Sequence, residues 1–428
     1  MTTDAVVTQL AERGVRFVRV MHADPFGRAR SKDLPLASLS MASSGLAYCA
    51  ASLVESLQGD PLMDASFPGG QGFPDLQARA QLSTARVTPW DPSTAWLLAD
   101  LVDHGSPSPL CARGALRRVV AQLSARGLHA VTASEPEFYL LRELPDGRIE
   151  RYSPGTGQAY TTGRRADPDG VLRRIHEALD AFGLKPTTAH REFSPGQFEI
   201  NLAHGEALEA ADRAFLLEEV IKDIAAGEGL LATFMAKPFA DHEGSSHHLH
   251  VSLWRGSENL FDSPDGLSPL GLSFAAGLLA HAAALTAIAS PTVNSYKRLG
   301  SEGLAPSLAG LGGDNRYAWL RVPAESGPGR RIEIRAGDAS ANPYLLTAAV
   351  LAAGLDGVDR ELSPDGLVAD KLPRTLEEAC VALEADAALG AALGDELVRV
   401  FCALKRDECH RFSRSVTDWE WREYARHA

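Results

Sequence analysis

Four short segments of the chain alternate polar and apolar residues, which is the pattern of β-strands with one polar and one apolar face. The segments are residues 135–139, 197–201, 248–252 and 331–335, and their polar positions are rich in carboxylates, imidazoles and guanidiniums. If the four strands share one sheet, these groups converge on one surface, where carboxylates repel one another unless a cation or a proton intervenes. The pattern therefore favours an enzyme that holds a divalent metal and an anionic substrate.

Apolar residues at helical spacing predict several helices. A helix over residues 343–356 would begin with Asn342 as its N-cap and Pro343 at its first position. The most apolar stretch, residues 274–289, is too short to span a bilayer and is predicted to form one buried helix. Further helices are expected at residues 113–126, 170–182 and 208–227, with two or three more at the end of the chain.

Turn-forming residues divide the chain into two predicted units. Residues 15–20 form a strand-like run, and a turn is expected at residues 24–27. The Gly- and Pro-rich stretch 67–74 predicts a loop, and the stretch 105–109 predicts a domain junction. We therefore expect a small N-terminal unit and a larger unit after it, with an α+β fold.

Composition and charge exclude several classes of protein. The 428 residues carry a formal net charge of −13 and no basic run, which argues against nucleic-acid binding. The chain begins without the basic and apolar stretch of a signal peptide, and we expect no contact with a membrane. The five cysteines form no Cys-x-x-Cys pair, so we expect reduced thiols in the cytoplasm, with neither disulfides nor a zinc site.

Several acidic side chains and one imidazole form the candidate metal site. The acids are Glu135, Glu137, Glu192 and Glu199, and the imidazole could come from His248 or His250. Oxygen ligands with an imidazole suit Mg²⁺ or Mn²⁺, and the Pro-Gly turn between Glu192 and Glu199 lets both face one site. Each residue alone could instead be a solvated acid or a core histidine, so the metal prediction depends on the several acidic segments together.

Five arginines within a short stretch complement these acids. They are Arg298, Arg316, Arg321, Arg331 and Arg335. Guanidinium groups bind phosphates and carboxylates with paired hydrogen bonds, so arginines beside a metal site favour phosphoryl transfer. The chain has neither a P-loop nor a Gly-x-Gly-x-x-Gly motif that opens a helix, so ATP, if it is a substrate, would bind on a sheet lined by metal ions.

Ordered motifs along nearly the whole chain resemble those of glutamine synthetase-like ligases. They are residues 135–138, 194–199, 235–238, 244–253, 291–298, 315–316, 331–335 and 342–344. The resemblance implies an N-terminal β-grasp domain (1–106) and a catalytic domain (107–428) with a curved antiparallel sheet flanked by helices. It also implies ATP as co-substrate, two to three Mg²⁺ or Mn²⁺ ions per site, and a homo-oligomer, a double-ring dodecamer with active sites between neighbouring subunits.

The positions of the motifs assign expected roles by resemblance. One metal would be held by Glu137, Glu192 and Glu199, and the other by Glu135, His248 and Glu333. Arg298 and Arg335 match the arginines that hold glutamate, near Gly244. Arg316 and Arg321 match those on the transferred phosphoryl group. The nucleotide contacts would include Ser252, His250, Arg321 and Arg331, and the expected catalytic residues are Arg298, Arg316 and Glu333.

Two departures from the family pattern concern the amine substrate. Ammonia-using members have a flap glutamate before an Ala-Pro, where this chain has Leu304, and an aspartate in the N-terminal domain, where residues 48–52 carry no acid. Those acids help to bind ammonium and to remove its proton. We therefore expect Leu304 to line a more apolar pocket, and glutamate to be joined to an organic amine (a mono-, di- or polyamine). A glutamine synthetase in which Glu302 replaces the flap acid is the alternative.

Other departures leave further alternatives. Glu243 stands where the family usually has an asparagine beside glutamate, so it could repel that substrate or bind an amine, and another acid could be the substrate. Ser246 and His247 also differ, with no expected chemical consequence. No counterpart of the tyrosine segment used for nucleotidylation follows residues 342–344. A non-catalytic structural or regulatory homologue is the alternative of another class, and the six expected metal ligands argue against it.

Overall fold

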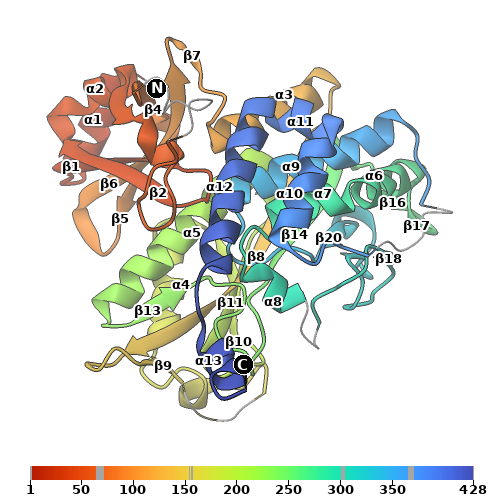
Figure 1. The fold of residues 1–428 in the computed structure, drawn as a ribbon. Coiled ribbons are helices and arrows are strands. Elements are labelled where there is room, and N and C mark those ends of the chain that lie inside the picture. The colour runs from red at the N-terminus through yellow and green to blue at the C-terminus, as the bar shows by residue number, and fades with distance from the viewer. Residues whose placement is uncertain are drawn as a thin grey trace.

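The computed structural model describes residues 2–63, 72–153, 155, 158–299, 304–364 and 371–427. Its N-terminal part contains a sheet in the order β2-β1-β6-β4-β3, with β5 and β7 also paired to β6 (Figure 1). Strands β1 and β6 are parallel, and the other pairs are antiparallel. The elements are α1 (Thr3–Glu12), β1 (Phe17–Ala23), β2 (Ala29–Pro35), α2 (Leu39–Ser44), β3 (Leu46–Cys49), β4 (Asp75–Ala80), β5 (Arg86–Thr88), β6 (Asp91–Asp103) and β7 (Ser106–Pro107).

The second, larger sheet has the order β10-β11-β8-β14-β20-β19-β18. Strands β9, β12 and β13 also pair with β8, and β15 pairs with β14. The strands are β8 (His129–Glu143), β9 (Ile149–Arg151), β10 (Pro186–Arg191), β11 (Gln197–Leu202), β12 (Gly205–Glu206), β13 (Leu231–Thr233), β14 (His247–Arg255), β15 (Glu258–Asn259), β18 (Leu311–Gly312), β19 (Leu320–Arg321) and β20 (Ile332–Ile334), with β16 (Asp262–Ser263) and β17 (Gly266–Leu267) as a separate pair.

The four predicted polar-apolar strands are consecutive neighbours in this sheet, as β11, β8, β14 and β20. All three junctions between them are antiparallel, which confirms that they share one sheet. The sheet is antiparallel except for β18 and β19, which pair in parallel. One boundary was wrong, because Arg331 and Arg335 flank the three-residue strand β20 and do not belong to it.

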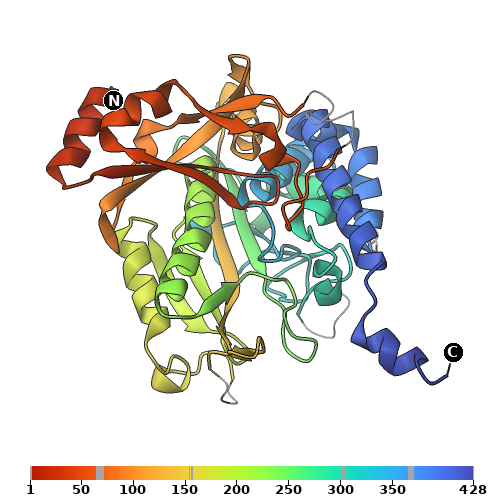
Figure 2. The same cartoon turned by 60° about the vertical axis from the view of Figure 1, so that its left-hand side comes forward.

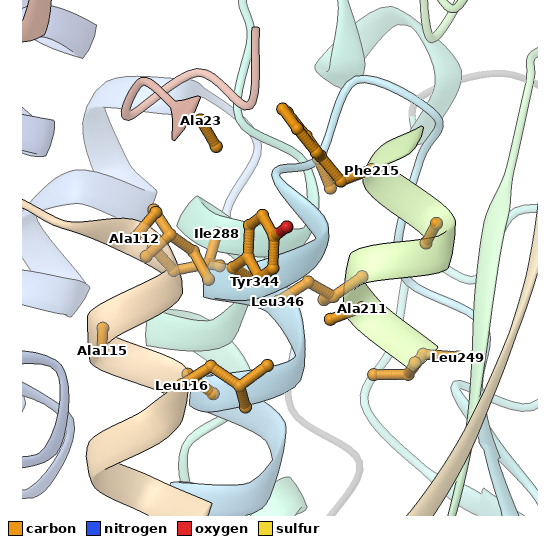
Figure 3. Packing of buried hydrophobic residues seen from close by; sticks show 14 of the residues in the cluster. Ala23, Ala112, Ala115, Leu116, Ala211, Phe215, Leu249, Ile288, Tyr344 and Leu346 are labelled. Atoms are coloured by element: carbon orange, nitrogen blue, oxygen red, sulfur yellow. The ribbon is translucent and has the colours of Figure 1, made fainter. Parts of the chain in front are cut away.

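The predicted helices after the N-terminal part are confirmed within a few residues. They are α3 (Ala112–Ala125), α4 (Val171–Ala181), α5 (Ala207–Gly227) and α9 (Pro343–Asp359). The Asn342 side chain caps α9 by accepting hydrogen bonds from the backbone N–H groups of Tyr344 and Leu345. Figure 3 shows Tyr344 of α9 between α3 and α5, where the apolar faces of the three helices form part of the core.

The stretch predicted to be one buried helix is two helices, α6 (Pro269–Ala280) and α7 (Ala282–Ala289). They are bent by 75° at the break. His281 lies at this break, with Nδ1 2.6 Å from Asp386 Oδ2 and Nε2 3.0 Å from Asp356 Oδ2. Asp356 lies in α9 and Asp386 is the N-cap of a later helix, so no local pattern predicted the bend. No single helix among the described residues is long and apolar enough to cross a membrane, although this bent pair passes that test by length and composition.

Residues 371–427, the last described part of the chain, contain four helices where two or three were expected. They are α10 (Leu376–Ala385), α11 (Ala387–Leu393), α12 (Asp395–Ser413) and α13 (Asp418–Tyr424), and a short helix, α8 (Ser295–Leu299), lies earlier. Single residues separate α10, α11 and α12: Asp386 caps α11, and Gly394 adopts a φ of +100° before α12. Helix α13 projects away from the body of the molecule (Figure 2).

A turn after β1 joins the N-terminal part to helix α9. The predicted turn at residues 24–27 is present, and Gly27 adopts a φ of +86°. A Cβ at this glycine would lie 3.0 Å from Asn342 Cα, and Asn342 Nδ2 donates a hydrogen bond to Asp24 O at 3.0 Å. The chain thus approaches the α9 cap too closely for a larger residue.

The structure leaves two predicted connections untested, the domain junction near residue 106 and the loop at residues 67–74. Ser106 and Pro107 form β7 at the edge of the first sheet, so a domain boundary after residue 106 would divide this strand, and that boundary stays a prediction. Most of the predicted loop at residues 67–74 lies outside the described residues.

Candidate active site

The register of the second sheet brings the predicted polar residues together. Directly opposite pairs are Glu199 with Glu137, His248 with Glu135, and His250 with Glu333. Opposite residues in antiparallel strands project to the same face with their Cβ atoms about 5 Å apart. Four strands from four separate parts of the chain therefore contribute to one polar surface.

Among the described residues, three overlapping groups in this region have the geometry of metal ligands. In each group, one potential ligand atom per residue lies within 4.8 Å of the others. The groups are Glu135 with His250 and Glu333, Glu135 with Glu199 and His248, and His190 with Glu192 and Glu199. The sequence-predicted ligands Glu135, His248 and Glu199 are thus close together, and Glu137 lies opposite Glu199.

Buried carboxylates in this cluster repel one another. Burial raises the pKa of Glu137 to about 7, and Glu192 adds to the effect. Burial together with Glu137, Glu135 and Glu192 raises the pKa of Glu199 to about 10. A divalent cation would stabilise both carboxylates in their ionised form, which is the condition under which they can be ligands. The residues therefore fit an Mg²⁺- or Mn²⁺-type ion.

The other two carboxylates are compensated by cationic or hydrogen-bonding groups. Burial alone would raise the pKa of Glu135, but His248 and His250 hold it well below its usual range. Burial of Glu333 is likewise outweighed by the two histidines, Arg335 and Arg321, so its pKa is lowered. Arg335 Nη1 and Arg321 Nη1 each lie 2.5 Å from an oxygen of Glu333.

His190 is a site residue that the sequence reasoning missed. Its Nε2 lies 2.7 Å from Glu192 Oε1 and 3.7 Å from Glu199 Oε1. On β10 it is paired directly with Glu199 of β11. The signal available in the sequence was its spacing of two residues from Glu192.

The predicted tight turn after Glu192 is present, with Gly196 at a φ of +77°.

The acid-rich face lines a cavity of about 370 Å³. Several predicted substrate residues line it together: Gly244, Arg298, Leu304, Arg316 and Arg335. Three aromatic residues that sequence reasoning missed, Tyr160, Phe193 and Tyr317, also line it and are largely exposed to solvent. The cavity therefore combines arginines and carboxylates with an apolar rim.

Close packing and one serine hold Arg298 in place. A Cβ on Gly244 would lie 2.4 Å from Ala236 O and 2.8 Å from Arg298 Cγ, so only glycine fits beside this arginine. Arg298 Nη2 donates to Ser246 Oγ at 2.8 Å, and the Ser246 backbone N–H donates to Glu137 Oε2 at 2.9 Å. Ser246 thus connects the arginine to a candidate metal ligand, although no chemical consequence of this residue was expected from the sequence.

His247 is buried, and burial lowers its pKa to about 4.

A second cavity of about 440 Å³ also includes Glu135 in its lining. It is lined by the predicted nucleotide contacts His250, Ser252 and Arg331, and Glu135 lines both cavities. Arg331 Nε donates to His250 Nδ1 at 3.1 Å. Arg321 is not among the lining residues, and its guanidinium contacts Glu333 and Asp314. Glu135 is thus shared by the acid-rich cavity and the cavity of the predicted nucleotide contacts.

Comparison with known proteins identifies the family. The sequence pattern described as glutamine synthetase, catalytic domain, matches residues 109–424. Over 445 aligned residues, the chain is 36% identical to a glutamine synthetase of Pyrococcus abyssi, and the match covers 97% of each protein.

The chain belongs to the glutamine synthetase family. It is also 34% identical over 445 residues to a glutamate–methylamine ligase of Methyloversatilis universalis, again covering 97% of each protein. A solved structure of GmaS in complex with ADP matches with a TM-score of 0.87 at 32% identity, over 98% of this chain and 99% of that one. The predicted glutamine synthetase fold is thereby confirmed, and the chain is an ATP-dependent ligase of this family.

Proposed function

We propose that this ligase joins glutamate to an organic amine through a γ-glutamyl phosphate. The observation that carries the proposal is Leu304, which lines the same cavity as Glu137 and Arg298. By resemblance, ammonia-using members have an acid at this position. An apolar side chain there, together with the exposed rings of Phe193 and Tyr317, suits a carbon-bearing amine better than a hydrated ammonium ion.

The two cavities suit the chemistry of such a ligase. A carboxylate is a poor electrophile, and phosphorylation by ATP gives it a good leaving group. With ATP in the cavity of His250 and Ser252, and glutamate beside Arg298 and Arg335, the transferred phosphoryl group would pass near Glu135. Bound divalent cations would neutralise phosphate charge. The arginines would orient the substrates and stabilise the same charge.

The residue roles are those implied by the family motifs. The proposed metal ligands are Glu135, Glu137, Glu192, Glu199, His248 and Glu333. Arg298, Arg335 and Gly244 would hold glutamate, and Arg316 and Arg321 would act on the phosphoryl group. His250, Ser252 and Arg331 would contact the nucleotide.

A glutamine synthetase that uses ammonia is the second candidate. Several relatives bear that name, including the one from Pyrococcus abyssi. Glu302, the acid that could compensate for Leu304, lies outside the described residues. Phosphate release from Mg²⁺-ATP with glutamate and a panel of acceptors separates the candidates: ammonium, methylamine, ethanolamine, diamines, polyamines and aromatic amines. Turnover mainly with ammonium would overturn the proposal, and no turnover with any acceptor would favour another acid substrate or a non-catalytic role.

Replacing Leu304 by glutamate is expected to raise the use of ammonium relative to organic amines at least about tenfold. The new carboxylate would bind the small cation, and a charged hydrogen bond contributes about 1.5–3 kcal/mol. The measurement is the ratio of kcat/KM for ammonium to that for the best amine. Leu308→Glu is the matched control, because Leu308 is 47% exposed and does not line the cavity. An unchanged ratio would remove Leu304 from the acceptor pocket.

We also propose a homo-oligomer, a double-ring dodecamer by resemblance, in which helix α13 contacts a second copy of the chain. Trp421 is 66% exposed and Trp419 56% exposed on this projecting helix (Figure 2). Large aromatic side chains in contact with water favour burial in an interface. Residues 48–52, which carry no acid, do not line the acid-rich cavity of their own chain. This agrees with the resemblance, which implies active sites between neighbouring subunits.

Changing Trp419 and Trp421 together to serine is expected to shift the protein to smaller assemblies. The two side chains would no longer bury apolar area against a second copy, and the loss should be visible as a lower mass by light scattering. Removing the exposed Tyr160 ring (Tyr160→Ser), which lies far along the chain from α13, is the comparison. An unchanged mass for the double variant would contradict this role of α13.

A further inference from the structure

Glu243 differs from the other carboxylates that line the acid-rich cavity. Glu135 contacts two histidines, Glu137 accepts from Gln197 and Ser246, and Glu192 and Glu199 contact His190. Among the described residues, the half-buried Glu243 carboxylate has no hydrogen-bond or ion-pair partner, and it belongs to none of the metal-ligand groups. It is therefore available to a cationic group of a substrate.

The backbone around Glu243 is fixed on both sides. Its N–H donates to Ser194 Oγ at 2.9 Å, and its carbonyl accepts from Tyr139 Oη at 2.7 Å. The next carbonyl, that of Gly244, accepts from Gln197 Nε2 at 3.0 Å, and the same amide donates to Glu137. Groups held in this way lose little freedom when they bind a ligand.

The charged groups near the Glu243 carboxylate include Arg298, the arginine proposed to hold glutamate. Burial lowers the pKa of Arg298, and the carboxylates of Asp338, Glu137 and Glu243 act against that effect. Glu243 is thus within electrostatic range of the substrate arginine, in a cavity that also exposes Leu304 and Phe193. A carboxylate beside an apolar wall is the arrangement that recognises an ammonium head with a carbon chain.

We propose that Glu243 binds the ammonium group of the acceptor amine and removes its proton. The inference deepens the proposed function and rests on it. Ammonia-using members bind and deprotonate ammonium with two acids that this chain lacks, at Leu304 and at residues 48–52. The Glu243 carboxylate, which comes from another loop, would take over both roles. Glu243 would then be a catalytic residue.

The ammonium nitrogen gives one proton to the Glu243 carboxylate, and its lone pair forms a C–N bond with the acyl carbon of γ-glutamyl phosphate. The C–O bond to phosphate then breaks, and phosphate leaves with the bonding electrons. The second proton lost by nitrogen goes to the departing phosphate, and Glu243 returns its proton to solvent.

The test is Glu243→Gln, which keeps the size of the side chain and removes its charge. With the acceptor that the wild-type enzyme uses best, we expect kcat/KM for that acceptor to fall at least about tenfold and KM for glutamate to stay within about twofold. The remaining activity should rise with pH up to the pKa of the amine, since only the free amine would react. Glu243→Asp should recover part of the loss.

Asp241→Asn is the matched control, because Asp241 lies two residues away on the same loop and its side chain is 84% exposed. A different result would overturn the proposal: a higher KM for glutamate, with loss of the preference for glutamate over glutarate. That result would assign Glu243 to the α-ammonium group of glutamate. Unchanged kinetics for both substrates would overturn it as well. If ammonium is the best acceptor and still depends on Glu243, the organic-amine proposal fails while the role of Glu243 stands.

Discussion

Replacing Glu333 by alanine is expected to lower turnover at least about a thousandfold. Glu333 is 1% exposed, lies 3.7 Å from His248, and contacts both Arg321 and Arg335 at 2.5 Å. Its loss would remove a proposed metal ligand and leave two guanidiniums without their shared carboxylate. Metal stabilisation of developing charge is worth several kcal/mol, and each 1.4 kcal/mol changes a rate about tenfold. The measurement is phosphate release with saturating Mg²⁺-ATP and glutamate.

A second variant separates loss of a ligand from loss of folding. Glu333→Gln keeps the side-chain volume, so its thermal unfolding should remain cooperative while its activity falls. Glu258→Ala, at an exposed glutamate on β15 of the same sheet, should retain normal turnover. Near-normal activity of Glu333→Ala would exclude Glu333 from the active site.

Removing divalent cations is expected to destabilise the protein increasingly as the pH rises from about 7 to about 10. The pKa values of Glu137, about 7, and Glu199, about 10, are above the ordinary value of 4.5. Below its folded-state pKa, each group keeps in the folded protein a proton that the unfolded state has already released, so stability without metal falls with pH until about 7 for Glu137 and until about 10 for Glu199. Mg²⁺ requires the ionised carboxylates, so its stabilising effect should grow with pH.

The measurement is Tm with EDTA and with excess Mg²⁺ across that range of pH. The difference should widen by several degrees, since one pKa unit corresponds to about 1.4 kcal/mol. The pKa of His281 is raised by its two aspartates against the effect of burial, so its contribution to stability is lost as the pH rises. This loss is the same with EDTA and with Mg²⁺, and it therefore does not affect the difference in Tm. Glu199→Gln should flatten the dependence. A Tm difference that does not change with pH would contradict the proposed link between these carboxylates and the metal.

Local patterns were sufficient for the four strands that carry the polar residues and for helices α3, α4, α5 and α9. Alternation identified the strands that carry Glu135, Glu199, His248 and Glu333, because side chains on a strand point alternately to its two faces whatever it pairs with. Capping residues marked the start of α9 for a similar reason, since Asn342 satisfies backbone groups within its own first turn. These signals lie within a few residues of the structure that they predict.

Features that depend on distant partners were missed. The break at His281 is accompanied by contacts with aspartates 75 and 105 residues later, and no apolar pattern in residues 274–289 encodes it. Ser246 matters because Arg298 donates to it from 52 residues away. His190 was overlooked because its relation to Glu199 depends on the pairing of β10 with β11.

The sequence by itself determined the family, the metal-binding residue types and the polar strands, because these follow from motifs and short-range periodicity. Only the tertiary structure decided which side chains meet. Strand order and register place Glu135 opposite His248 and in the lining of both cavities, and loop packing leaves the Glu243 carboxylate without a hydrogen-bond or ion-pair partner among the described residues. Such contacts join residues far apart along the chain, and their geometry is fixed by the packing of the whole sheet and its helices.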